Sequence, residues 1–118
     1  IRAEEIKKSL QADIQAELTH AQQLANRIKT IGGRVPGSKV MQFSQDSLQP
    51  PEDLTDLVAV IKGVIEAEDA AVNQYNTVIR LCEGVDYVTQ DLCIQILGDE
   101  ESHRREFLGF LKEYERQS

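Results

Sequence analysis

Both histidines of the chain, His20 and His103, stand three residues after a glutamate, Glu17 and Glu100 respectively. Residues i and i+3 share a face of a helix, so each pair can offer a carboxylate oxygen and an imidazole nitrogen to one metal ion. Two such pairs on the helices of a bundle are the core of a carboxylate-bridged two-metal site. Twelve of the 118 residues are glutamate, so both matches together arise by chance in about one sequence in a hundred. The spacing therefore predicts a two-metal site, provided that the helices bring the pairs together.

Each predicted helix carries one glutamate within an apolar stripe of seven-residue spacing. The three stripes are Ala3, Leu10, Glu17, Leu24 and Ile31; Leu54, Ile61, Glu68, Tyr75 and Cys82; and Cys93, Glu100, Phe107 and Tyr114. A carboxylate buried in such a stripe is costly unless it is paired or bound to a metal. We therefore predict that Glu17, Glu68 and Glu100 are metal ligands together with His20 and His103.

Two ordinary explanations compete with this prediction. A core glutamate can pair with an arginine, and a core histidine can simply be hydrogen-bonded. The candidate arginines are Arg27, Arg80, Arg104 and Arg105. For one helix we would favour these explanations, but three coincident glutamates favour the metal. Oxygen-rich ligands with one imidazole per ion suit iron or manganese, with zinc as a substitute. Tyr75, seven residues after Glu68, is either a hydrogen-bond donor beside the site or a core residue.

The element pattern predicts an all-α chain that forms one domain over residues 1–118. Helical stretches cover residues 2–31, 52–83 and 86–116, and the proline-containing segment 33–51 is expected to be a long crossover along a bundle. Gly84 leaves almost no linker between the last two helices, so they should form an antiparallel hairpin. A turn near Gly84 places Glu68 and Glu100 at about the same height, roughly 24 Å from the turn.

Composition narrows the classes of function. The net charge is −7 and there is no basic arm or stripe, so we expect no nucleic-acid partner. No apolar run approaches the length of a membrane span, so no membrane association is expected. Cys82 and Cys93 do not form a Cys-x-x-Cys motif. On the hairpin their heights differ by roughly 9 Å, so we expect free thiols and a cytoplasmic setting.

The motif segments resemble the ferritin-like superfamily, and more narrowly its bacterioferritin and Dps-like branch. The similar segments are Glu-Leu-Thr-His at 17–20, Glu-Asp-Ala-Ala-Val-Asn-Gln-Tyr at 68–75, and Asp-Tyr-Val-Thr-Gln-Asp through Asp-Glu-Glu-Ser-His at 86–103. The resemblance implies a ferritin-like antiparallel bundle. It also implies that Glu17 and Glu100 bridge two irons, that His20 binds the first, and that Glu68 and His103 bind the second.

The resemblance further implies a ferroxidase that oxidises Fe²⁺ with O₂ or H₂O₂ in iron storage or oxidative-stress protection. Members of the family form homo-oligomers, many of them cages. Bacterioferritins place a haem-ligating methionine where this chain has Leu18, so no haem is expected. The family pattern has a helix before the first Glu-x-x-His pair, and that helix supplies a fourth carboxylate. Because the chain begins at Ile1 without such a helix, we expect that it was lost from a longer protein or comes from another chain. The ferroxidase prediction depends on that helix.

Two alternatives remain open at this stage. One is a di-metal enzyme of another class that scavenges peroxide at the same site. The other is a catalytically incomplete subunit of a helical assembly, in which the site is inactive without the missing carboxylate.

Overall fold

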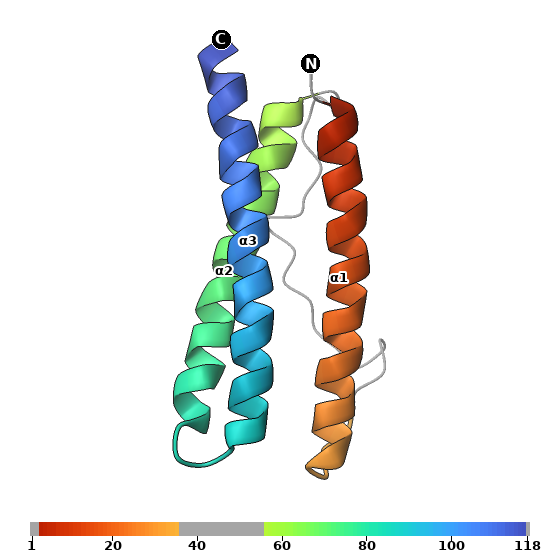
Figure 1. Cartoon of the computed structure of the whole chain (residues 1–118), viewed down its shortest axis with the longest axis vertical. Coiled ribbons are helices and arrows are strands. Elements are labelled where there is room, and N and C mark those ends of the chain that lie inside the picture. Colours follow the sequence, from red (N-terminus) through yellow and green to blue (C-terminus); the bar gives the residue numbers. More distant parts are fainter. Residues whose placement is uncertain (1–2, 36–55, 118) are drawn as a thin grey trace. The chain divides into compact units, whose positions relative to one another are not determined.

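The computed structural model describes residues 3–35 and 56–117 and contains three helices in these ranges (Figure 1). They are α1 (Ala3–Thr30), α2 (Leu57–Cys82) and α3 (Tyr87–Gln117). These described ranges contain no strand, so the predicted all-α class is confirmed. The chain divides into two compact units, residues 1–44 and 45–118. Most of the predicted crossover, residues 36–51, lies outside the described residues.

Helix α2 starts at an aspartate cap. Asp56 has an extended backbone conformation (φ −77°, ψ 90°), and its carboxylate accepts a hydrogen bond from the Ala59 amide at 3.1 Å. This is the usual N-cap arrangement, in which a short polar side chain satisfies an amide of the first turn. The sequence predicted a start near residue 52; residues 52–55 are outside the described part, and Asp56 precedes the helix.

A tight turn joins α2 to α3 and sets the two helices side by side in an antiparallel hairpin (Figure 1). Gly84 has a φ of +72°, which a residue with a Cβ adopts only at a cost. The amides of Val85 and Asp86 both donate to the Cys82 carbonyl at 2.9 Å. Asp86 then caps α3 by accepting from the Thr89 amide at 3.0 Å. The predicted short hairpin connection is confirmed.

The apolar core of the hairpin contains the middle part of the two predicted stripes, whereas Tyr75, Cys82 and Tyr114 are only partly buried. The buried residues of α2 and α3 are Ile61, Glu68, Cys93, Ile96, Glu100, Phe107 and Phe110. Phe107 is fully buried, and its ring packs edge-on against Phe110 with centroids 5.3 Å apart. Burying a side chain of this kind stabilises the fold by about 1.5–3 kcal/mol. Two glutamates are thus held among the most buried residues of this unit.

Helix α1 ends at Thr30, one residue before its predicted end, and is followed by the paired glycines. Gly32 has a φ of +91°, and the Gly33 amide donates to the Ile28 carbonyl at 2.8 Å. With the bond from the Gly32 amide to Lys29, this is a Schellman motif. A glycine at this position allows the left-handed backbone that closes the helix.

The predicted seven-residue stripe of α1 is wrong. Glu17 and Ile31 from that stripe are exposed, whereas Ile6 and His20 are buried. The physical reason is that the period of a helix does not by itself decide which of its faces is covered, because burial depends on what packs against the helix. None of the helices in the described ranges is both long enough and apolar enough to cross a bilayer.

Candidate metal centre

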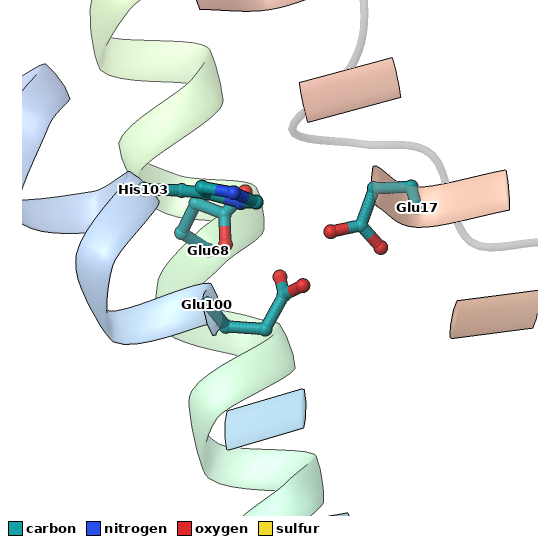
Figure 2. Close-up of side chains that lie close together, drawn as sticks. All are labelled: Glu17, Glu68, Glu100 and His103. Carbon is teal, nitrogen blue, oxygen red and sulfur yellow. The ribbon is translucent and has the colours of Figure 1, made fainter. Parts of the chain in front are cut away.

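Three of the predicted ligands form a cluster inside the α2–α3 hairpin. Glu68 comes from α2, and Glu100 and His103 come from neighbouring turns of α3. One ligand atom from each lies within 4.8 Å of the corresponding atom of the others. Figure 2 shows the side chains of Glu68 from α2 and of Glu100 and His103 from α3 lying close together on one side of the two helices. We call these three residues the hairpin cluster.

The local sequence explains why the hairpin cluster forms. Glu100 and His103 are three residues apart, which puts both side chains on one face of α3. Glu68 lies opposite because the turn at Gly84 is nearly equidistant from residues 68 and 100 along the chain. The prediction that the hairpin levels these two glutamates agrees with the cluster.

The hairpin cluster is buried. Glu100 is 2% exposed and Glu68 is 8% exposed, while His103 is partly exposed. Two carboxylates this close repel each other when both are ionised, and burial removes the water that would screen them. A cation between them would relieve both costs. The cluster is therefore a site where charge placement favours a bound positive ion.

The donor atoms suit a transition metal. Two atoms that each bind one ion at about 2.1 Å can be at most about 4.2 Å apart, and the 4.8 Å limit of the hairpin cluster is close to that. Carboxylate oxygens with one imidazole are typical ligands of iron and manganese. The residues present therefore fit a carboxylate-bound iron.

The other predicted pair, Glu17 and His20, lies on α1 in the first unit. The two side chains share a face, with His20 Nδ1 3.6 Å from Glu17 Oε1. His20 is 4% exposed, whereas the Glu17 side chain is 46% exposed. Glu17 is also labelled in Figure 2. That Glu17 and His20 are metal ligands stays a prediction.

The competing explanation was that a core glutamate pairs with an arginine. Arg104 does not do so in the structure. Its guanidinium forms an ion pair with Asp69, the residue after Glu68. Arg80 donates to Thr77 within α2 at 3.5 Å. The Asp69–Arg104 pair was not predicted, although it follows from the same register that aligns the cluster. Tyr75 is partly buried on α2, and its predicted role is not tested by its position.

Both cysteines are free, as expected, and Cys93 is buried. Burial raises the pKa of the Cys93 thiol above its ordinary value of 9.0, and the neighbouring Cys82 and Asp86 raise it further. A raised thiol pKa means that little thiolate is present at neutral pH. Cys93 is therefore poorly suited to be a metal ligand or a nucleophile.

A helical hairpin with a buried cluster of carboxylates and a histidine is the kind of architecture in which helical-bundle proteins place metal ligands. A family model described as "Ferritin-like domain" matches residues 1–117. The chain therefore belongs to the ferritin-like family. A comparison with curated proteins finds no match.

Proposed function

We propose that this protein is a ferroxidase-type di-iron carboxylate protein that oxidises Fe²⁺ with O₂ or H₂O₂. The observation that carries the proposal is the hairpin cluster, in which Glu68, Glu100 and His103 lie within 4.8 Å of one another in a ferritin-like chain. Iron is here both the ion that the site holds and the substrate that it oxidises. The setting would be iron storage or oxidative-stress protection in the cytoplasm, in a homo-oligomer.

The proposed roles follow the chemistry of each donor. Glu68, Glu100 and His103 would hold one iron, and Glu100 would also reach the other. Glu17 and His20 would hold the other iron, with Glu17 as a second carboxylate shared by both; that these two side chains share one face of α1 supports their acting as a pair. Bridging carboxylates keep paired ions about 3.5–4 Å apart. Tyr75 would donate a hydrogen bond to the carboxylates.

The chemistry that the irons supply is one electron each to the oxidant. H₂O₂ takes two electrons and two protons and becomes two waters; O₂ takes two electrons and two protons and becomes H₂O₂. The protein favours the oxidised ions because hard, anionic oxygen ligands stabilise the higher charge. Glu68 and Glu100 are buried, so bulk water has little access to these two carboxylates.

A fourth carboxylate is needed to match the family pattern, and the described helices offer three glutamates to the site. This observation favours one alternative function, a structural subunit of a helical assembly without catalysis. The ferroxidase proposal requires that another helix supplies the missing carboxylate. A di-metal enzyme that scavenges peroxide uses the same residues and differs in its preferred oxidant.

Anaerobic titration with Fe²⁺ followed by air tests the proposal. We expect ferric absorbance that saturates at about two irons per chain. Glu68→Ala and His103→Ala should each slow oxidation at least tenfold, because each removes a ligand. Glu66→Ala, an exposed glutamate two positions earlier on α2, is the matched control and should oxidise iron normally. Unchanged rates in both ligand variants would refute the ferroxidase, and no iron binding by the wild type would favour the structural subunit.

A further inference from the structure

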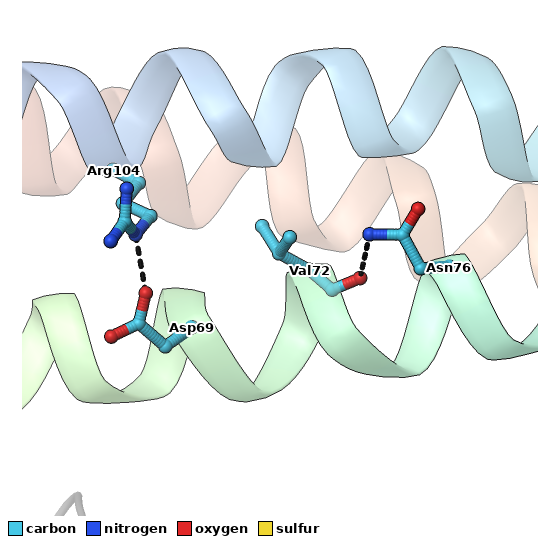
Figure 3. Close-up of polar contacts among 4 residues, drawn as sticks. All are labelled: Asp69, Val72, Asn76 and Arg104. Carbon is cyan, nitrogen blue, oxygen red and sulfur yellow. Dashed lines mark hydrogen bonds and ion pairs between the residues drawn. The ribbon is translucent and has the colours of Figure 1, made fainter.

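An ion pair crosses the hairpin beside the cluster. Asp69 on α2 directly follows Glu68, and Arg104 on α3 directly follows His103. The Arg104 Nε donates to Asp69 Oδ1, as Figure 3 shows with the dashed line between the two helices. The next polar contact drawn along α2, from Asn76 to the Val72 carbonyl at 3.0 Å, stays within that helix. Asp69–Arg104 is thus a direct link between the two helices at the height of the cluster.

The exposure of this pair argues against a main role in stability. The side chains of Arg104 and Asp69 are 40% and 48% exposed, and half-exposed ion pairs contribute little to folding because water and salt screen them. Arginine has a planar group whose donors have fixed directions. An ion pair of this kind constrains geometry more than it adds stability.

The geometry it constrains is the register of α2 against α3. Changing the register by one residue shifts the contacting side chains of one helix by about 1.5 Å along its axis and by about 100° around it. A metal site tolerates misplacement of only about 0.5 Å and 10–20°. Closer to the turn, Gln90 of α3 donates to the Ile79 carbonyl of α2 at 3.0 Å. The two contacts lie at different distances from the turn. Together they therefore oppose both sliding and rotation of α2 against α3.

The ion pair with Asp69 also compensates the positive charge of Arg104 beside the site. A lone arginine one residue from His103 would repel a bound cation. Because Arg104 pairs with Asp69, its charge is compensated and it does not need to pair with Glu68 or Glu100. Asp69 in turn is directed toward Arg104 rather than offered as an additional ligand.

We propose that Asp69 and Arg104 are positioning residues that hold Glu68 of α2 against Glu100 and His103 of α3 in the geometry that binds metal. The proposal rests on the proposed function, because it concerns the same site. It adds residues that touch neither iron nor oxidant and act through their neighbours in the chain.

Co²⁺ binding to the whole protein tests the proposal, because the visible absorbance of Co²⁺ reports both affinity and ligand geometry. Asp69→Asn and Arg104→Gln should each weaken binding about tenfold, the lower end of the range for residues that orient ligands. Both should alter the cobalt spectrum while leaving the helical circular dichroism and the melting temperature nearly unchanged. The charge swap D69R/R104D should recover most of the affinity, because it restores a cross-helix ion pair.

Glu66→Gln and Arg105→Gln change the same charges at exposed neighbouring positions and should bind Co²⁺ normally. Wild-type affinity and spectrum in both Asp69→Asn and Arg104→Gln would overturn the positioning role while leaving the proposed function intact. Equal weakening in the two control variants would overturn it as well, because bulk charge would then be the cause. If the wild type binds no Co²⁺, the proposed function fails together with it. Should a single variant lose its helical signal, the charge swap and its controls still decide the question.

Discussion

The carboxylates of Glu68 on α2 and Glu100 on α3 lie within 4.8 Å of each other inside the hairpin. Both side chains are buried, and their closeness follows from the turn at Gly84, which is nearly equidistant from them in sequence. Two buried carboxylates this close cost folding free energy unless a proton or a cation compensates them. The two carboxylates therefore lower the stability of the metal-free protein and favour the binding of a cation.

Removing one of these charges should stabilise the protein when no metal is present. Glu100→Gln keeps the shape of the side chain and abolishes the repulsion with Glu68. We expect a gain of up to about 3–4 kcal/mol in the free energy of unfolding, since two unit charges 4.8 Å apart repel each other by about 3.5 kcal/mol at an effective dielectric constant near 20. Thermal unfolding after dialysis against a chelator measures it. Added Co²⁺ should then raise the melting temperature of the wild type and have little effect on the variant.

The control for this prediction is Glu101→Gln, which removes the same charge one residue further along α3, where the side chain is exposed. Its melting temperature should match that of the wild type with and without Co²⁺. A Glu100→Gln variant that is less stable than the wild type without metal would show that the two carboxylates do not repel each other significantly.

Phe107 should be among the most costly residues of the hairpin to truncate. It is fully buried and packs edge-on against Phe110. Phe107→Ala removes most of a ring and leaves a cavity, so we expect a loss of about 3–5 kcal/mol in urea unfolding. Phe107→Leu keeps most of the volume and should lose less than half as much. A loss below about 1 kcal/mol for Phe107→Ala would mean that this part of the core is loosely packed.

The two cysteines should differ in their reaction with iodoacetamide. Cys93 is 1% exposed and its pKa is raised, whereas Cys82 is partly exposed at the end of α2. Alkylation requires an accessible thiolate, so Cys82 should be modified first in the folded protein and Cys93 only on unfolding. Peptide mass spectrometry over a time course distinguishes the two sites. Equal rates in the native protein would contradict the burial of Cys93.

The raised pKa of Cys93 also predicts a loss of stability at alkaline pH. Above the ordinary value of 9.0 the thiol of the unfolded chain loses its proton, while the buried thiol of the folded chain keeps it. The folded state then binds more protons than the unfolded state, so stability falls as the pH rises above 9.0. This contribution is fully present below that pH. Cys93→Ala should show a shallower decline than the wild type in urea unfolding at a series of pH values, and parallel curves would contradict the assignment.

The hairpin and its cluster could be predicted because short-range rules fix them. Gly84 defines the turn, seven-residue spacing places Glu68 and Glu100 in the core stripes, and i,i+3 spacing adds His103. Asp86, the cap of α3, follows from the same local chemistry. Each of these inferences depends on residues within one helix or on a connection of a few residues.

The parts that could not be predicted depend on longer connections or on side-chain choice. The stripe on α1 was wrong at Glu17 and Ile31, because the face of a helix that is buried depends on its partners and not on its period alone. Helix α1 ends at Thr30 and α2 begins at Leu57, and over a connection of that length Glu17 could not be placed by counting from a turn. Arg104 was considered a partner for a core glutamate and instead pairs with Asp69, because both side chains project from the half-exposed edge of the hairpin.

The proposed ferroxidase activity requires iron held by Glu68, Glu100 and His103. The most direct measurement is anomalous diffraction at the iron absorption edge from crystals grown or soaked anaerobically with Fe²⁺. We predict two anomalous peaks about 3.5–4 Å apart, one of them within bonding distance of Glu68 and His103, with Glu100 contacting both. Fully occupied iron bound elsewhere, with no anomalous peak at these three side chains, would contradict the account.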